Sequence, residues 1–228
     1  MRVELYYSYI SEGDHPLWAG RLPHLPEGRR QRVAARQCPA DRARSVAVTA
    51  LLQWAVSEWE KGAGFGNEGV VFRTVPVTAL STLFPYWEAG QTGRPFPAGI
   101  PTAAGRVWVS LSHSSGHLLV AVADRPVGAD IQCHAHPALA PRRFRRLDGR
   151  IRHPAESPAE TAKETAARWA AKEAAAKLTG QGLATSFRRL KVASDRVVHS
   201  DGTADSLFFW NTPTFTAAAV VKAAIPAG

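Results

Sequence analysis

The segment Trp169–Gly180 reads WAAKEAAAKLTG and predicts a helix that carries one carboxylate and two ammonium groups. Trp169, Glu173 and Lys177 are four residues apart, so they share one face of this helix, while Lys172 lies about 100° away. The alanines between them are strong helix formers and their small side chains allow close packing on a sheet. The segment therefore predicts a helix that packs on strands, in a fold of mixed α and β content.

Asp130 stands 43 residues before Glu173, in the segment Val127–Gln132 (VGADIQ), which predicts a short strand. Side chains alternate along a strand, so Asp130 and Gln132 face the same way. Two oxygen-bearing side chains on one face could hold a hard cation. Taken alone, a polar strand end and an i,i+4 Glu–Lys pair are common surface features of small energetic weight.

The rest of the sequence predicts further strands and helices. Alternating apolar residues predict a strand at 3–9. Further short segments are interpreted as strands at 106–111, 118–123, 190–193, 196–199, 206–210 and 214–221, with a candidate strand at 70–72 and a polar turn at 112–117. One helix is expected to begin at Pro39 and end at Gly62. A capping box, Ser157-Pro-Ala-Glu160, predicts that the helix containing Glu173 begins there. Both halves contain a strand–turn–strand unit, which favours two similar α+β lobes.

The composition is that of a globular protein, with 45% apolar and 21% charged residues among 228. Polar residues interrupt every apolar run before a membrane span would be complete, and we expect a cytoplasmic protein with no membrane partner. Cys38 and Cys133 have no metal-ligand spacing, so reduced thiols are expected. The formal charge of +9 would attract phosphates, nucleic acid or an acidic protein, and does not choose among them.

In combination, these segments resemble the 4′-phosphopantetheinyl transferases of the surfactin-synthetase-activating type. That family shares the helical motif W-x-x-K-E-x-x-x-K-x-x-G-x-G-L, which residues 169–183 match at every defined position. It also has a G-[KR]-P element, a [NS]-[LI]-S-H-S turn and a strand motif G-[IVA]-D-[IV]-E. These stand here, in the same order, as Gly93–Pro95, Ser110–Ser114 and Gly128–Gln132. The four elements cover about residues 93–183.

The resemblance implies an α+β fold of two pseudo-symmetric α/β lobes, with coenzyme A in the cleft between them. Residues 1–123 would contact the coenzyme A nucleotide, and residues 124–228 would hold Mg²⁺ and the catalytic helix. It also implies a reaction in which a serine of an apo acyl or peptidyl carrier protein attacks the β-phosphate of coenzyme A. The phosphopantetheine arm is then transferred and 3′,5′-ADP leaves.

The resemblance assigns roles to individual residues. Asp130, Gln132 and Glu173 would bind Mg²⁺, and Glu173, or a water that it orients, would accept the serine proton. Lys177 would stabilise charge on the leaving phosphate, with Lys172 as a second candidate. Contacts with coenzyme A would come from Lys177 and from six further residues, namely Arg32, Arg36, Arg44, Arg94, Ser112 and His113. Of these, Arg44 with Arg32 or Arg36 would hold the 3′-phosphate.

Position 132 departs from the family pattern, because Gln132 stands where the strand motif has a second acid. An amide oxygen can ligate Mg²⁺ but brings no charge. We therefore expect activity with a weaker affinity for the metal.

The resemblance suggests what the positive net charge would attract. Carrier proteins are commonly acidic around the modified serine, and coenzyme A is polyanionic. We expect a monomer that recognises an acidic carrier protein. Two alternatives stay open: a non-catalytic relative that only binds coenzyme A, and a basic nucleic-acid-binding protein. Against the latter, the sequence has no zinc-ligand spacing and no aromatic RNA-binding motif, so no nucleic acid partner is expected.

Overall fold

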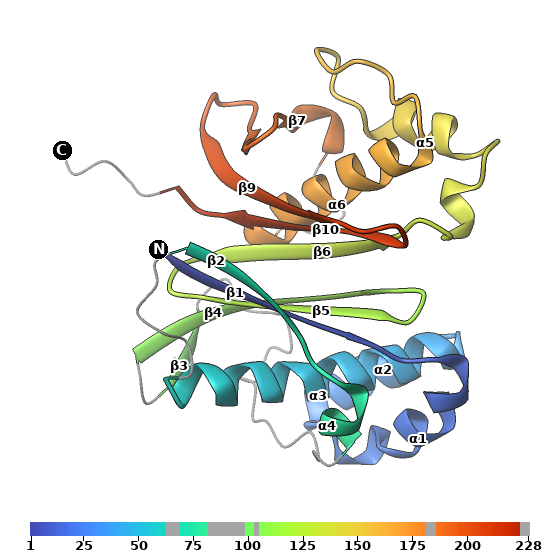
Figure 1. Ribbon diagram of the computed structural model, residues 1–228, viewed down its shortest axis with the longest axis vertical. Helices are drawn as coiled ribbons and strands as arrows, with labels where there is room; N and C mark the ends of the chain where they lie inside the picture. The colour runs from blue at the N-terminus through green and yellow to red at the C-terminus, as the bar shows by residue number, and fades with distance from the viewer. Residues whose placement is uncertain (63–68, 82–98, 103–104, 181–185, 224–228) are drawn as a thin grey trace. The chain divides into compact units, whose positions relative to one another are not determined.

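The computed structural model describes residues 1–62, 69–81, 99–102, 105–180 and 186–223. The chain divides into two compact units, Met1–Asp124 and Arg125–Gly228, and each contains a five-stranded sheet with helices (Figure 1). The predicted mixture of helices and strands is therefore confirmed. The pseudo-symmetry of the two lobes, and the ligand roles given to them, stay predictions.

The first unit is built on a sheet with the strand order β2-β1-β5-β4-β3. Its strands are β1 (Arg2–Tyr9), β2 (Gly69–Thr74), β3 (Ile100–Thr102), β4 (Gly105–Ser114) and β5 (His117–Ala123). Its helices are η1 (Glu12–Asp14), α1 (His15–Gly20), η2 (Leu22–His24), α2 (Glu27–Ala34), α3 (Pro39–Glu60) and α4 (Val77–Ser81). As predicted, α3 begins at Pro39, and its apolar side packs on β4 and β5.

The polar turn predicted at 112–117 is shorter in the structure. Strand β4 runs through Ser114, where Ser114 pairs with His117 of β5, so only Ser115 and Gly116 form the turn. Ser115 has a φ of 48°, in the left-handed region. Backbone pairing with β5 thus decides the conformation of the polar residues that the sequence pattern placed in the turn.

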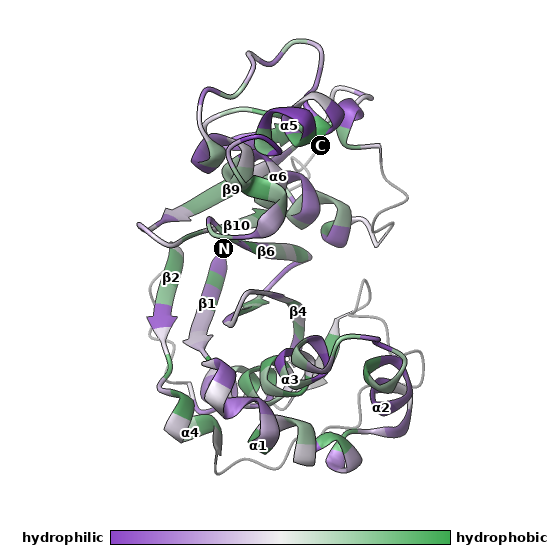
Figure 2. Ribbon diagram, turned by 90° about the vertical axis from the view of Figure 1, so that its right-hand side faces the viewer, coloured by the Kyte–Doolittle hydropathy of each residue, from purple (hydrophilic) through white to green (hydrophobic). Residues whose placement is uncertain are grey.

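The second unit is built on an antiparallel sheet with the strand order β6-β10-β9-β8-β7. Its strands are β6 (Val127–Cys133), β7 (Lys191–Val192), β8 (Arg196–Val198), β9 (Ala204–Asn211) and β10 (Phe215–Val221). Its helices are η3 (Pro137–Leu139), α5 (Phe144–Ile151), α6 (Ala162–Leu178) and η5 (Phe187–Arg189). Helix α6 lies across β6 and β10, which are largely hydrophobic, whereas α5 carries strongly hydrophilic residues (Figure 2).

Helix α6 begins later than predicted. Its N-cap is Thr161, whose side chain accepts a hydrogen bond from the backbone N–H of Glu164 (3.1 Å). The predicted capping box at Ser157 is instead part of the connection from α5: the carbonyl of Ser157 accepts a bond from Arg168, and the N–H of Ala159 donates to Asp148. These contacts hold residues 157 and 159 in the connection, and α6 therefore begins later than the capping-box pattern predicted.

Two further findings concern the described residues. Cys38 and Cys133 are both free thiols. Among the helices in this part of the chain, none is long and apolar enough to cross a membrane.

Candidate active site

Strand β6 and helix α6 approach each other unusually closely at Gly128. A Cβ atom placed on Gly128 would lie 1.9 Å from the carbonyl oxygen of Ala174 and 2.6 Å from the backbone nitrogen of Leu178. The facing side of α6 is built from buried alanines, including Ala170 and Ala174. The absence of a side chain at Gly128 and the small ones on α6 thus bring the helix backbone against the strand.

This close approach brings three of the predicted residues together. The ammonium of Lys177 donates hydrogen bonds to Asp130 Oδ1 (2.7 Å) and to the carbonyl of Ala129 (3.0 Å). Asp130 is only 7% exposed. Glu173, one turn before Lys177, accepts a hydrogen bond from the side chain of Trp169 and is close enough to Asp130 to be repelled by it.

The carboxylates of this group outnumber its ammonium groups. Burial and the repulsion by Asp130 raise the pKa of Glu173, although Lys177 and the Trp169 hydrogen bond partly oppose the rise. Gln132 is buried two residues after Asp130 on the same face of β6 and adds a neutral amide. Over the described parts of the chain, no cluster of three or more His, Cys, Asp or Glu could hold a metal. A cation here would therefore rely on two carboxylates and one amide.

Lys172 does not join this group. Its side chain is completely buried, and its ammonium donates to Glu156 Oε2 (2.9 Å) and to the carbonyl of Ile151 (2.8 Å). Burial lowers the pKa of Lys172 to about 8, against the hydrogen bond to Glu156, which raises it. The charge of Lys172 is thus directed at the connection between α5 and α6, and we assign it a different role below.

In the first unit, the structure gathers a second set of predicted residues around Asp41. Arg44 donates to Asp41 Oδ1 (2.7 Å), and Arg36 lies 3.6 Å from the other carboxylate oxygen. Burial opposes the ionisation of Asp41, but Arg44, His113 and Arg36 together hold its pKa below the usual value. His113 also shares a hydrogen bond with the hydroxyl of Ser45 (3.2 Å).

Arginines outnumber acids in this set. Burial, followed by the charges of Arg36 and Arg32, lowers the pKa of Arg29 to about 10. Arg29 and Arg32 lie on α2, whereas Arg36 lies just beyond its C-terminal end. A concentration of guanidinium groups that repel one another suits a phosphate ligand.

Ser112 is not brought to this set. Ser112 and His113 are neighbours on β4, so their side chains point to opposite faces of the sheet, and His113 is on the face that α3 covers. Arg94 lies outside the described residues, together with Gly93 and Pro95.

Sequence reasoning missed the partners that orient the predicted residues. Asp41 and Ser45 are one turn apart on α3, the spacing at which two helical residues share a face, but nothing local pairs them with His113. Trp169 was placed on the face of Glu173, four residues before it, and this spacing could have indicated the hydrogen bond between them.

Comparison with known proteins adds a finding about the second unit. No curated protein matches the chain. Residues 126–222 match the family model of the 4′-phosphopantetheinyl transferase superfamily. The matched segment includes β6, α6 and the group formed by Asp130, Glu173 and Lys177. Residues 126–222 of this chain are therefore a domain of the 4′-phosphopantetheinyl transferase superfamily.

Proposed function

We propose that the protein transfers the 4′-phosphopantetheine arm of coenzyme A to a serine of an apo acyl or peptidyl carrier protein and releases 3′,5′-ADP. The superfamily domain at residues 126–222 supports a transferase of phosphopantetheine. The observation that carries the proposal is the group on β6 and α6, in which Asp130 binds Lys177 and repels Glu173. It combines a proton acceptor, a cation and two metal-ligand carboxylates.

The donor set of this group fits a divalent cation. Asp130 and Glu173 bring two negative charges, and Lys177 brings one positive charge. The pKa of Glu173 is raised, so its ionised carboxylate is disfavoured in these surroundings and would be stabilised by a further cation. We propose that Asp130, Glu173 and the amide of Gln132 hold Mg²⁺. When bound, the metal would neutralise charge on the pyrophosphate of coenzyme A.

The residues of the chain supply the rest of the chemistry. The serine hydroxyl oxygen forms a bond to the β-phosphorus, and the bond from that phosphorus to the bridging pyrophosphate oxygen breaks. Glu173, directly or through a water, accepts the proton of the serine, a role for which a raised pKa is favourable. The ammonium of Lys177 balances the negative charge of the departing 3′,5′-ADP.

Coenzyme A is proposed to use the arginine-rich set of the first unit as well. Arg44, with Arg32 or Arg36, would bind the 3′-phosphate, and Ser112, His113 and Arg94 would give further contacts. The gathering of Arg36, Arg44 and His113 around Asp41 supports this assignment. We also propose that the two units are related lobes of the transferase fold and that the protein acts as a monomer.

The test is direct transfer. The protein is mixed with coenzyme A, Mg²⁺ and a panel of apo carrier proteins, and the phosphopantetheine adduct is sought by mass spectrometry. Glu173→Gln should lower the transfer rate by about 10²–10⁴-fold, because a positioned proton acceptor contributes this much. The exposed Glu160→Gln, two residues before the start of α6, is the matched control and should transfer normally.

Two results would count against the proposal. A near-normal rate in Glu173→Gln would reject the role of Glu173. Binding of coenzyme A by the wild type without an adduct on any carrier would favour the non-catalytic relative.

A further inference from the structure

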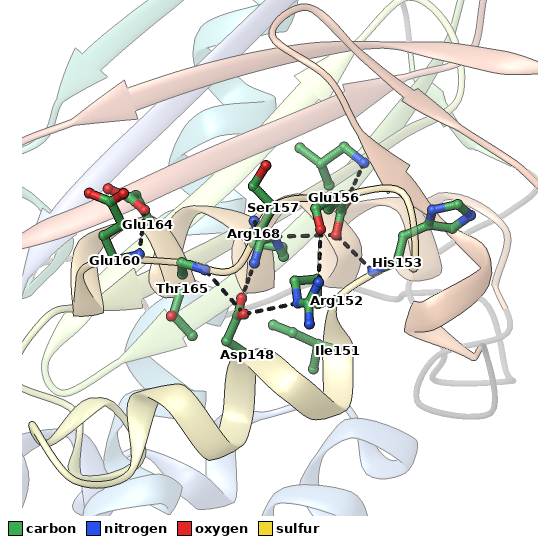
Figure 3. A network of polar contacts seen from close by, with 12 residues as sticks. Asp148, Ile151, Arg152, His153, Glu156, Ser157, Glu160, Glu164, Thr165 and Arg168 are labelled. Carbon is green, nitrogen blue, oxygen red and sulfur yellow. Dashed lines mark hydrogen bonds and ion pairs between the residues drawn. The ribbon is translucent and has the colours of Figure 1, made fainter.

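A buried polar network ties helix α6 to the connection that precedes it (Figure 3). Its centre is Glu156, whose side chain is only 5% exposed. Its carboxylate accepts hydrogen bonds from the backbone N–H groups of His153 (2.8 Å) and Val192 (2.6 Å) and from the ammonium of Lys172 (2.9 Å). The guanidinium of Arg168 lies 3.3 Å away. Glu156 therefore joins α6, β7 and the α5–α6 connection.

The network holds two successive turns of α6. Arg168 and Lys172 are four residues apart, on one face of the helix, and both contact Glu156. Arg168 also forms an ion pair with the buried Asp148 of α5 and donates to the carbonyl of Ser157 (2.9 Å). The acceptors of these cations lie on α5 and on the connection that follows it, where the carbonyl of Ile151, the last residue of α5, also accepts from Lys172.

The side of α6 that faces the sheet fixes the rotation of the helix less well than the side that carries Arg168 and Lys172. It contacts the sheet through Ala170, Ala174 and other alanines, and through the bare backbone at Gly128. Alanines allow close approach, but they lack the long side chains that interlock with a neighbouring element and define one register. The cations of Arg168 and Lys172 have fixed acceptors, which they reach at one rotation and one axial position of α6.

We propose that Glu156 is a positioning residue: by binding Lys172 and Arg168 it fixes the rotation of α6 and so directs Glu173 and Lys177 at Asp130. Lys172 immediately precedes Glu173, and consecutive helical residues are about 100° apart, so anchoring Lys172 sets the direction of Glu173. This role rests on the proposed function, because it concerns the same catalytic helix.

A role in positioning differs from a role in stability. A buried ion pair is commonly replaced by apolar residues without loss of stability, because the desolvation of two charges offsets their attraction. Removing one partner alone leaves a buried charge without its counterion and lowers stability. The positioning role therefore predicts that the folded fraction of such a variant has a displaced catalytic group and a lower turnover. A purely stabilising role predicts an unstable protein whose folded fraction has normal turnover.

The first variant is Lys172→Met, which keeps the length of the side chain and leaves Glu156 with Arg168 and two backbone donors. Turnover is measured at 20 °C, with the folded fraction checked by circular dichroism. We expect kcat to fall about 10- to 100-fold and KM for coenzyme A to change less than about threefold, because small misplacement of a catalytic group acts on the chemical step. Lys163→Met, at an exposed lysine of the same helix, is the control and should change neither. A wild-type kcat in folded Lys172→Met would overturn the proposal.

A second variant tests the proposal if Lys172→Met does not fold, and a second measurement tests it if the wild type shows no transfer. If Lys172→Met does not fold, Glu156→Gln, which keeps an acceptor for the N–H of Val192, should give the same fall in kcat. Hydrogen exchange of the free protein, followed by mass spectrometry, should show amides 169–178 exchanging at least fivefold faster in either variant. This measurement does not depend on transfer. If the wild type modifies no carrier, the proposed function fails, and unchanged exchange in both variants would separately overturn the positioning role.

Discussion

Glu173 is an acid whose surroundings oppose its charged form. Burial and Asp130 raise its pKa above the usual 4.5, so the folded state binds a proton more tightly than the unfolded state. The protein therefore loses stability as the pH rises from 4.5 through the folded pKa, and the loss persists at neutral pH. A residue kept for chemistry at a cost in stability is common in active sites.

Glu173→Gln should accordingly melt at a higher temperature than the wild type at pH 7 when divalent metal is removed with EDTA. The advantage should shrink as the pH falls toward 4.5, because the wild-type carboxyl becomes protonated. Adding Mg²⁺ should also reduce it, since a cation would favour the wild-type carboxylate. The measurement is thermal unfolding by circular dichroism, with Glu160→Gln as the control. Equal or lower stability of Glu173→Gln at pH 7 in EDTA would contradict this assignment.

At the residue scale, short sequence spacing predicted part of the site. The four-residue spacing of Trp169, Glu173 and Lys177 placed them on one helical face, and the structure connects both of the others to Glu173. Lys172 could not be assigned in the same way. Its partner, Glu156, is 16 residues away in a connection with no regular structure, so the burial of this lysine depends on tertiary packing.

At the scale of elements, the contact of β6 with α6 makes a prediction about Gly128. Gly128→Ala would put a methyl group 1.9 Å from the carbonyl oxygen of Ala174. The atoms it would meet belong to the backbone of α6, so the clash could be relieved only by a shift of the helix or the strand. Overpacking of this kind costs about 1–3 kcal/mol, which corresponds to a fall in Tm of about 2–12 °C. Thermal unfolding measures the change, and the transfer rate should fall with it because the helix carries Glu173 and Lys177.

Gly149→Ala is the matched control for this substitution. Gly149 lies on α5, and an added Cβ would meet no atom within 4 Å. Alanine should therefore stabilise this helix by about 0.5–1 kcal/mol. A Tm of Gly128→Ala equal to that of the wild type would show that α6 can move away from β6, contrary to a fixed position of the helix on the strand.

The elements themselves were predictable to different degrees. Short, mostly apolar segments predicted β6 and β10 well, and every residue of both strands is buried. The extent of β4 and the start of α6 were not predictable in this way. Pairing with β5 extends β4 through polar residues, and the ion pair of Asp148 with Arg168 holds residues near Ser157 in a connection instead of a helix.

At the scale of the whole molecule, the positive charge is unevenly divided. Arg125–Gly228 carries 16 Lys and Arg against nine Asp and Glu, whereas Met1–Asp124 carries 12 against ten. Much of the excess lies in the segment 142–152, where Arg142, Arg143, Arg145, Arg146 and Arg150 are exposed. The acid of this segment, Asp148, is buried and bound to Arg168, so it does not offset the exposed charges.

Under the proposed function, this uneven charge predicts where an acidic carrier protein would be attracted. The double variant Arg145→Gln/Arg146→Gln should raise KM for the carrier several-fold at 50 mM NaCl and leave kcat unchanged, because exposed charges at a rim act on encounter. At 500 mM NaCl the difference from the wild type should largely vanish, since screening shortens the range of the attraction. The double variant Arg30→Gln/Lys61→Gln removes the same charge from the first unit, and its KM should change less than twofold. Equal effects of the two double variants would mean that net charge, and not the segment 142–152, attracts the carrier.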